Sequence, residues 1–363
     1  MKITVIGCGN GAFATAADLT AKGHQITLFV DAKHEKNFME IKKDNIIHCT
    51  GVGPQGDIKI HAVTCDLDEA MADYDIIMPV TPSYAQEEIA TYLIPLLKDG
   101  DKIILSPGST GGSLVFAKIF HDLRPELKVK IAEIHTLPYT ARKTDAKSVN
   151  ISLMTNVMYF AAFPACYNEE MFELTKIMYP TITLVRDVLE ASMNNGNATT
   201  HPAPVVLNAG KIEYYGKHYH YKEGITPSVG RVVQMIDDER KMICRAFGYK
   251  EIDIKDRLEL MGYCPHGETV YECIQGSTDI FLPLEGPNDL NGRYLAEDAP
   301  LSLLAMASIG KASGVQTPLM ESIVNLAAAL KNEDYWTTGR TLEKMGLDGK
   351  SVEEMKAFLE NGY

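Results

Sequence analysis

The sequence predicts an α/β fold with an N-terminal Rossmann dinucleotide-binding domain, built on a mostly parallel doubly wound sheet, and a C-terminal mostly α-helical domain. Two observations predict it. In the first half, continuous apolar runs alternate with stretches of helical spacing, which is typical of parallel strands covered on both faces. After about residue 187, strand-like runs almost vanish and helical patterns dominate. The predicted domains are therefore 1–187, which binds the dinucleotide, and 188–363, which carries substrate binding and catalysis.

The elements follow from these patterns in chain order. Continuous apolar runs predict strands at 3–6, 26–30, 76–80, 103–105, 129–132, 149–154, 158–163 and 181–185. Helical spacing predicts helices at 84–97, 112–123, 169–178, 205–215, 228–246, 301–313 and 319–330. Between residues 44 and 65 the pattern is choppier and rich in glycine, which indicates short strands that leave the main sheet.

Composition excludes several classes of protein. The 363 residues include 45% hydrophobic and 23% charged side chains, which are ordinary globular values. With 48 acidic and 35 basic residues the net charge is −13, a field that repels nucleic acid. No apolar stretch is long enough to span a membrane. Seven cysteines, an odd number, are typical of reduced thiols and predict a cytoplasmic location. The expected partners are small-molecule substrates and, for the assembly, a homodimer.

The strand at 3–6 runs into a glycine-rich turn that opens a helix. The turn reads Gly7-Cys8-Gly9-Asn10-Gly11-Ala12, a G-x-G-x-x-A motif. Gly7 permits the tight turn, Gly9 allows a pyrophosphate to approach the backbone, and Ala12 is small enough for helix–strand contact. The diphosphate would lie at the helix N-terminus. We expect Gly7, Gly9, Asn10, Gly11 and Ala12 to bind a dinucleotide.

Asp31 lies at the end of the second predicted strand, where a carboxylate can accept hydrogen bonds from the adenine ribose and repel a 2′-phosphate. It favours NAD. Lys33, two residues later, could pair with that phosphate and keeps NADP as the alternative. A solvated aspartate at a strand end remains the simpler interpretation of Asp31.

Other loops follow the carboxyl ends of predicted strands and should face the same crevice. Thr81 and Pro82 follow the strand at 76–80, and Ser109 lies in the loop after 103–105. Thr136 lies after a further strand. We expect Thr81 and Pro82 to contact the cofactor, although each of these loops could also be only a turn.

The second domain offers a proton donor and a possible carboxylate clamp. His201 lies just past the predicted boundary, and histidine is the usual proton-transfer group near neutral pH. Farther on, Arg293 precedes Asp298 by five residues. This spacing fits either a surface ion pair or a guanidinium that binds a substrate carboxylate beside an aspartate that orients the histidine.

Two groups of residues contain side chains that could bind a metal ion, but neither group is predicted to form a metal site. His218 and His220 alternate with tyrosines between lysines, so we interpret that stretch as solvated and polar. Cys264, His266 and Cys273 provide no fourth ligand of a zinc site. Hydride chemistry with histidine and arginine needs no metal, and none is expected.

Several motifs, in order along almost the whole chain, resemble the opine dehydrogenases, the octopine/nopaline dehydrogenase family. They are Gly7-x-Gly9-x-x-Ala12, Thr136-Leu137-Pro138-Tyr139, His201-Pro202 with Asn208, Glu223-Gly224-Ile225-Thr226-Pro227-Ser228 followed by Asp237-Asp238-Glu239-Arg240, and Arg293-Tyr294-Leu295-x-Glu297-Asp298. The resemblance implies that His201 transfers protons and that Asp298 orients it. It implies substrate-binding roles for Arg293, Thr136, Ser109 and Asn208. Ser302 and Ser109 depart from residues common in relatives, glycine and glutamine respectively.

The resemblance implies an NAD(P)H-dependent condensation of an amino acid with an α-keto acid, for which we expect pyruvate, to an N-(carboxyalkyl) amino acid, and the reverse reaction. A 2-hydroxy acid or ketopantoate-type reductase shares this two-domain plan but typically uses a lysine as proton donor. No comparable lysine motif stands at the predicted domain junction. A non-catalytic dinucleotide-sensing protein would keep the glycine turn but would have no need of His201, Arg293 and Asp298 together.

Overall fold

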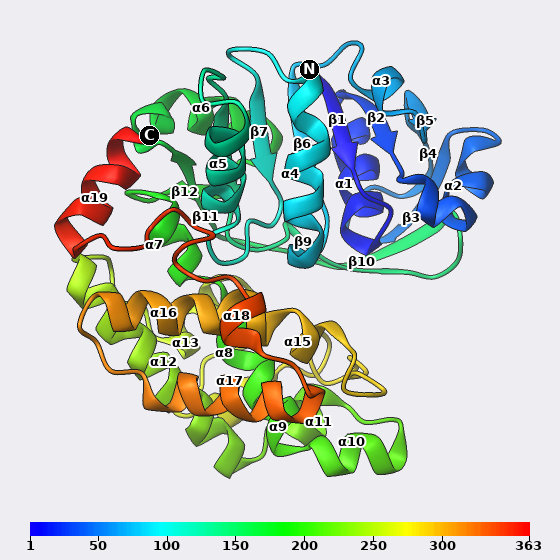
Figure 1. The fold of residues 1–363 in the computed structure, drawn as a ribbon. Coiled ribbons are helices and arrows are strands. Elements are labelled where there is room, and N and C mark those ends of the chain that lie inside the picture. Colours follow the sequence, from blue (N-terminus) through cyan, green and yellow to red (C-terminus); the bar gives the residue numbers. More distant parts are fainter. The chain divides into compact units, whose positions relative to one another are not determined.

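The structure is a computed structural model that describes the backbone of residues 1–363 and every side chain outside 35–38. The chain forms two compact units (Figure 1). Unit 1 comprises Met1–Gly108, Val115–Val188 and Tyr363, and unit 2 comprises Ser109–Leu114 and Leu189–Gly362. Every strand of the described chain lies in unit 1, and the long segment of unit 2 is helical. The predicted fold class is confirmed.

An eight-stranded sheet forms the centre of unit 1. Its strands, in spatial order, are β12 (Ile182–Leu184), β11 (Met158–Phe163), β8 (Lys130–Ile134), β7 (Lys102–Leu105), β6 (Ile76–Pro79), β1 (Lys2–Ile6), β2 (Gln25–Phe29) and β5 (Ala62–Thr64). Neighbours are parallel except β8 and β11. The chain proceeds from β1 through β2 to β5 on one side and then from β6 outward on the other. The switch point of this doubly wound sheet lies between β1 and β6, where such folds bind dinucleotides.

A second sheet in unit 1 consists of β4 (Gly56–Lys59), β3 (Ile46–Gly51), β10 (Ser148–Met154) and β9 (Tyr139–Lys143), in that spatial order. Helix α1 (Asn10–Ala21) packs against strands of both sheets. The Tyr139 hydroxyl donates to Asp18 of α1 at 2.5 Å, a buried bond that joins helix and second sheet. The predicted departure at 44–65 is thus confirmed for β3 and β4, while β5 rejoins the main sheet.

The remaining helices of unit 1 surround the sheets. They are α2 (Glu35–Lys42), α3 (Leu67–Ala70), α4 (Gln86–Leu93), α5 (Gly112–Leu123, whose first turn belongs to unit 2) and α6 (Asn168–Met178). Short 3₁₀ turns lie at Ala32–His34, Ser83–Ala85, Ile94–Leu96 and Ala165–Tyr167. The helical stretch predicted at 84–97 is confirmed at its centre by α4, which is flanked by two of these turns. Pro95 within the second turn has no N–H to continue an α-helix.

Unit 2 is built from helices. After α7 (Val188–Met193), which begins at the unit boundary, they are α8 (Gly196–Thr200), α9 (Pro202–Leu207), α10 (Ala209–Tyr215), α11 (His220–Gly224), α12 (Pro227–Phe247), α13 (Ile254–Leu260), α14 (Val270–Gly276), α15 (Arg293–Ala296), α16 (Leu304–Ala312), α17 (Pro318–Lys331), α18 (Tyr335–Thr338) and α19 (Val352–Asn361). The π-helical turn Ala299–Leu303 precedes α16. The helix predicted at 205–215 is broken at Asn208, and the one predicted at 301–313 begins as the π turn. Among the described residues, no helix combines the length and apolar character needed to cross a membrane.

The charged stretch in the middle of α12 is largely buried. Asp237 accepts hydrogen bonds from Nε of Arg240 and Nη2 of Arg257, each at 2.7 Å, and from the backbone N–H of Ile254 at 2.9 Å. All three side chains of this group, which we call the Asp237 cluster, are at most 2% exposed. Two guanidinium charges therefore share one carboxylate in the core of unit 2, and the loss of that carboxylate leaves both uncompensated.

We expect Asp237→Ala to destabilise the protein by about 3–5 kcal/mol, the usual cost of removing one partner from a buried ion pair. The measurement is the free energy of unfolding in urea. The matched control is Asp238→Ala, because Asp238 is the next residue of the same helix and its side chain is 52% exposed. Equal losses in the two variants would contradict the structural role given to the Asp237 cluster.

Candidate functional site

The turn between β1 and α1 carries the features of a dinucleotide cradle. Gly7 has a φ of +139°, and a Cβ there would lie 2.5 Å from the Val80 carbonyl oxygen. Only glycine fits this position without strain. The same Cβ would lie 3.3 Å from the Cβ of Ala12, so the small side chain at position 12 lets α1 approach the strand. Both residues therefore have the roles in packing that the motif predicts.

Gly9 differs from Gly7 because the space beside it is open. A Cβ at Gly9 would meet no described atom within 4 Å. Gly9 is also the N-cap of α1, so no side chain caps the backbone N–H groups at this end of the helix. None of the described residues in the first turn of α1 is acidic. Backbone N–H groups at such a helix end bind phosphate. Thr81 adds a buried hydroxyl for which no protein partner occurs among the described residues. These features fit a dinucleotide pyrophosphate.

Asn10 and Gly11 serve the fold as well as the turn. The side-chain oxygen of Asn10 accepts the backbone N–H of Lys143 in β9 at 2.9 Å, which ties the turn to the second sheet. A Cβ at Gly11 would lie 2.9 Å from a methyl carbon of Leu137. Gly11 is therefore needed for packing, whereas Gly9 is needed for open space.

Asp31 follows β2 and is paired within the chain. One carboxylate oxygen accepts the backbone N–H of Lys33 at 2.9 Å, and the other lies 3.4 Å from the Lys33 ammonium. The same ammonium binds both carboxylate oxygens of Glu88 in α4 at 2.7 and 2.9 Å. Lys33 is thus held between two carboxylates, and Glu88 is a residue at this end that the sequence patterns did not single out.

The remaining loop residues lie in different units. Pro82 precedes the 3₁₀ turn Ser83–Ala85 of unit 1, and partly buried Thr136 lies between β8 and β9. Ser109 belongs to unit 2, is 6% exposed and has a φ of +62°. The segment Ser109–Leu114 is held within unit 2 by Arg340, whose Nη1 donates to the Thr110 carbonyl at 2.7 Å.

Unit 2 brings together the two residues expected to transfer protons. His201 lies between α8 and α9, and Asp298 lies directly before the π turn. Nδ1 of His201 is 2.8 Å from a carboxylate oxygen of Asp298, although the residues are 97 positions apart. Their exposed fractions are 5% and 6%. The predicted contact is confirmed, and we call it the His201–Asp298 pair.

Tyrosines surround the histidine ring. The Tyr221 hydroxyl lies 2.9 Å from Nε2 of His201, and the ring of Tyr294 stacks on the imidazole at a centroid distance of 3.7 Å. Burial raises the pKa of Tyr221 well above its ordinary value, so its hydroxyl stays protonated and can donate. The sequence motifs include Tyr294 but predict no role for Tyr221. The signal that could have found Tyr221 was its place in an aromatic stretch rich in histidine.

The interpretation of that stretch as solvated was wrong. His218 is 1% exposed and His220 is completely buried. Nε2 of His220 donates to the Thr200 carbonyl at 3.0 Å, and its ring meets the His201 ring edge-on at 5.6 Å. Burial lowers the pKa of His220 well below its ordinary value, and nearby His201 lowers it further. The uncharged ring of His220 therefore lines the site beside His201.

The Asp298 carboxyl group lies in a charged but buried setting. Burial raises the pKa of Asp298 well above its ordinary value, neighbouring Glu297 raises it further, and the Arg293 guanidinium opposes the shift. Arg293 forms a two-point ion pair with Glu297 through Nε and through Nη2, the latter at 3.3 Å. The Arg293 side chain is 53% exposed and that of Glu297 only 3%. Arg293 thus pairs with Glu297, four residues on, while its charge also acts on the Asp298 carboxyl group.

Asn195 joins the two segments that carry the pair. Its side-chain oxygen caps α8 by accepting the N–H of Asn197 at 3.2 Å, and its amide donates to the hydroxyl of Ser302 at 3.2 Å. Ser302 lies in the π turn that follows Asp298, so its hydroxyl gives this departure from relatives a structural role. Asn208 instead donates to the carbonyls of Pro204 at 2.8 Å and Gly224 at 3.0 Å. Only its carbonyl oxygen could then meet a substrate.

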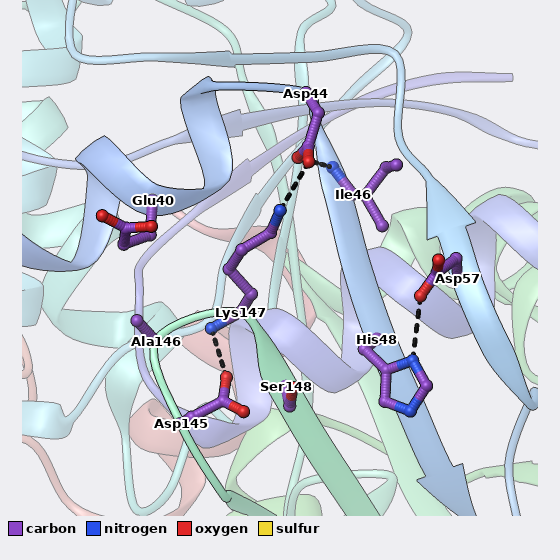
Figure 2. Close-up of a pocket in the computed structure, with 9 residues that line it drawn as sticks. All are labelled: Glu40, Asp44, Ile46, His48, Asp57, Asp145, Ala146, Lys147 and Ser148. Atoms are coloured by element: carbon purple, nitrogen blue, oxygen red, sulfur yellow. Dashed lines mark hydrogen bonds and ion pairs between the residues drawn. The ribbon is translucent and has the colours of Figure 1, made fainter.

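A surface cavity of about 500 Å³ lies elsewhere, on the second sheet of unit 1 (Figure 2). Its polar side chains pair with one another: Lys147 with Asp44 at 2.6 Å, and His48 with Asp57 at 2.9 Å. None of the sequence-predicted site residues lines it. Within the described residues, no group of three or more histidines, cysteines and carboxylates could hold a metal ion.

Comparison with known proteins links both units to dehydrogenases. Residues 184–331 match the family described as NAD/NADP octopine/nopaline dehydrogenase, alpha-helical domain, and residues 2–116 match the N-terminus of NAD-dependent glycerol-3-phosphate dehydrogenase. An opine dehydrogenase of Arthrobacter sp. strain 1C is 34% identical over 359 residues, which cover 98% of each chain.

Two solved structures share the fold. Octopine dehydrogenase in complex with NADH and agmatine has a TM-score of 0.79 at 18% identity, covering 100% of this chain and 98% of that one. Yersinopine dehydrogenase with bound NADP⁺ has a TM-score of 0.73 at 15% identity, with coverages of 99% and 98%.

Substitutions at two glycines of this turn should distinguish an effect on cofactor binding from an effect on folding. Gly9→Val should leave the melting temperature unchanged, because the space beside Gly9 is open, but should abolish binding of NADH and NADPH by filling that space. Gly11→Val should instead lower the melting temperature through its clash with Leu137. Binding is measured by fluorescence titration of the reduced cofactors. Normal binding by the folded Gly9→Val protein would remove the turn from the cofactor site.

Proposed function

Because this chain belongs to the octopine/nopaline dehydrogenase family, it is an NAD(P)-dependent oxidoreductase acting on CH–NH bonds, and we propose that the His201–Asp298 pair transfers the protons of its reaction. In that reaction the amine of an amino acid adds to the carbonyl carbon of an α-keto acid, water leaves, and the C=N bond is reduced. The bound nicotinamide cofactor supplies the hydride. Pyruvate is the keto acid that we propose.

His201 would act twice. The amine attacks only after it loses a proton, which a neutral imidazole can accept, and the hydroxyl of the carbinolamine leaves as water when an imidazolium returns a proton. Asp298 accepts the hydrogen of Nδ1, so Nε2 is the ring nitrogen that exchanges protons with the substrate. The carboxylate also stabilises the positive ring between the two steps. The single observation that carries this proposal is the buried 2.8 Å contact between Nδ1 and Asp298.

We propose that Arg293 contacts a substrate carboxylate. The Arg293 side chain is half-exposed, and Glu297 orients its guanidinium through two hydrogen bonds. Glu297 directly precedes Asp298 in the sequence. A planar guanidinium held in one orientation suits a carboxylate better than a flexible ammonium does. Ser109, Thr136 and Asn208 are proposed as further substrate contacts, and Asn208 would act only as an acceptor.

On the cofactor side, we propose that the open space at Gly9, the N-terminus of α1, Thr81 and Pro82 hold the dinucleotide. NAD is the preferred form in this proposal, because Asp31 and Glu88 both repel a 2′-phosphate and hold the ammonium of Lys33 between them. A cytoplasmic location and a homodimer stay predictions, and the odd number of cysteines supports the former.

The proton-transfer role predicts a non-additive pair of substitutions. His201→Ala should lower amine-dependent NADH oxidation by about 10²–10⁴-fold, the usual range for loss of a general acid–base group. Asp298→Asn should lower it less. The double variant should be little worse than His201→Ala, because the two residues act as one unit.

The matched control for this pair is Asp237→Asn, which alters a buried aspartate of unit 2 outside the site. Asp237→Asn should destabilise the protein, and it shows whether destabilisation by itself lowers the turnover of the molecules that stay folded. Fully additive losses in the His201 and Asp298 double variant would overturn the proposal.

Cofactor preference should depend on Glu88 through Lys33. Glu88→Gln releases one partner of the ammonium, so we expect the ratio of NADP to NAD affinity to rise about 2- to 5-fold, in line with the ~0.5–1 kcal/mol of an exposed ion pair. Asp31→Ala should also raise this ratio. Dissociation constants of NADH and NADPH at low salt provide the measurement. Glu87→Gln, with the same charge change on the same helix, should leave the ratio unchanged; a wild-type preference for NADPH would overturn this assignment.

A further inference from the structure

The proposed chemistry uses the imidazole of His201 and the carboxylate of Asp298, but it assigns no part to the third group bonded to them. The hydroxyl of Tyr221 lies 2.9 Å from Nε2, the nitrogen that must exchange protons with the substrate. Tyr221 is 4% exposed, so this hydroxyl and the ring it meets are both enclosed by protein. A buried polar contact on a reacting nitrogen needs an explanation.

Packing places the Tyr221 ring in one position. It stacks on Phe281 at a centroid distance of 4.1 Å and an interplanar angle of 15°, and Tyr263 stacks on the same Phe281 ring at 5.4 Å. The Tyr221 carbonyl accepts the side-chain amide of Gln275 at 3.2 Å, which fixes the backbone of α11. The hydroxyl therefore reaches Nε2 because the ring is held, and not through a chance orientation of an exposed side chain.

The direction of the hydrogen bond follows from the chemistry of its partners. With Asp298 ionised, as the proposed proton transfer requires, its carboxylate can only accept, so Nδ1 of His201 carries the hydrogen and Nε2 of the neutral ring is an acceptor. Tyr221 must donate. A hydrogen bond donated to Nε2 stabilises the neutral imidazole, whereas the carboxylate on Nδ1 stabilises the charged one.

We propose that Tyr221 is a positioning residue for His201: by donating its hydroxyl hydrogen to Nε2 it keeps the ring of the free enzyme neutral, in the tautomer that can accept a proton, until the substrate takes its place at that nitrogen. This inference rests on the proposed proton-transfer role of His201. In the free enzyme Tyr221 and Asp298 fix both ring nitrogens. When the amine or carbinolamine hydroxyl binds Nε2, the tyrosine contact is exchanged for a substrate contact.

The groups that face His201 come from three elements. Asp298 approaches from the start of the π turn, with Glu297 and Arg293 beside it. Tyr221 and His220 approach from α11, and Tyr294 approaches from α15. Burial lowers the pKa of His220, which favours its neutral form. Asp298 and Tyr221 are thus the groups that meet the two ring nitrogens of His201, at 2.8 and 2.9 Å.

The test is Tyr221→Phe, which keeps the ring and its stacking but removes the hydroxyl. Loss of the donor should favour the protonated ring, so the acidic limb of the pH profile of kcat/KM, which reports the free enzyme, should move to higher pH by about one unit, the effect of one ordinary hydrogen bond. The limb of the kcat profile should stay in place, because the substrate has already replaced Tyr221 in that complex. Substrate ionisation is common to both proteins and cancels.

Tyr263→Phe is the matched control, since it removes a hydroxyl from the same aromatic row and leaves the bond between Tyr221 and His201 in place, and it should leave both limbs in place. Two unmoved limbs in Tyr221→Phe, or equal movement of both limbs, would overturn the role of Tyr221. If His201→Ala keeps full turnover, the proposed function fails instead.

The unsubstituted protein provides a second readout that does not depend on the variant. Imidazole ¹⁵N chemical shifts, assigned by comparison with His201→Asn, should show Nδ1 protonated and Nε2 as an unprotonated acceptor in the free enzyme. The opposite tautomer would overturn the proposal.

Discussion

The arrangement of the candidate site depends on one hydrogen bond, between Nδ1 of His201 and the carboxylate of Asp298. Removing a carboxylate from water costs free energy unless hydrogen bonds and charge compensate it. Here the compensation comes from the imidazole and from the Arg293 guanidinium, whereas the neighbouring Glu297 opposes it. Once the ring is fixed at Nδ1, its face stacks on Tyr294 and its other nitrogen points at Tyr221. The rest of the site is organised around that ring.

Holding two residues 97 positions apart at this distance requires a rigid frame, and unit 2 builds it with buried polar groups. Asn195 links the segment before His201 to the π turn after Asp298. Glu239 of α12 accepts the backbone N–H groups of Leu319 and Met320 at 2.8 and 2.9 Å, which fixes the N-terminus of α17. Such groups are costly when unpaired, so the hydrogen bonds of Asn195 and Glu239 favour this arrangement of the helices.

The parts that sequence could predict are those whose cause is local. The β1 strand, the glycine turn and α1 follow from periodicity and from backbone geometry that glycine alone permits at Gly7. The contact between His201 and Asp298 could be expected only from resemblance to a family, because no local pattern brings distant residues together.

Where tertiary structure overrides local pattern, the predictions were wrong. Polar residues between lysines suggested a solvated stretch, but packing against Phe281 and Thr200 buries Tyr221 and His220. The helix expected through Asn208 breaks because its amide binds two carbonyls, one of them in Gly224. The catalytic and binding roles of the named residues stay predictions.

The most direct measurement is the mass of the product formed from NADH, pyruvate and an amino acid labelled with ¹⁵N. A buried histidine that both accepts the amine proton and releases water predicts a secondary amine that contains the label and the carbon skeleton of both substrates. A panel of amino acids identifies the amine that is used. Formation of lactate alone across that panel, with no ¹⁵N in the reduced product, would contradict the function and point to a simple keto-acid reductase.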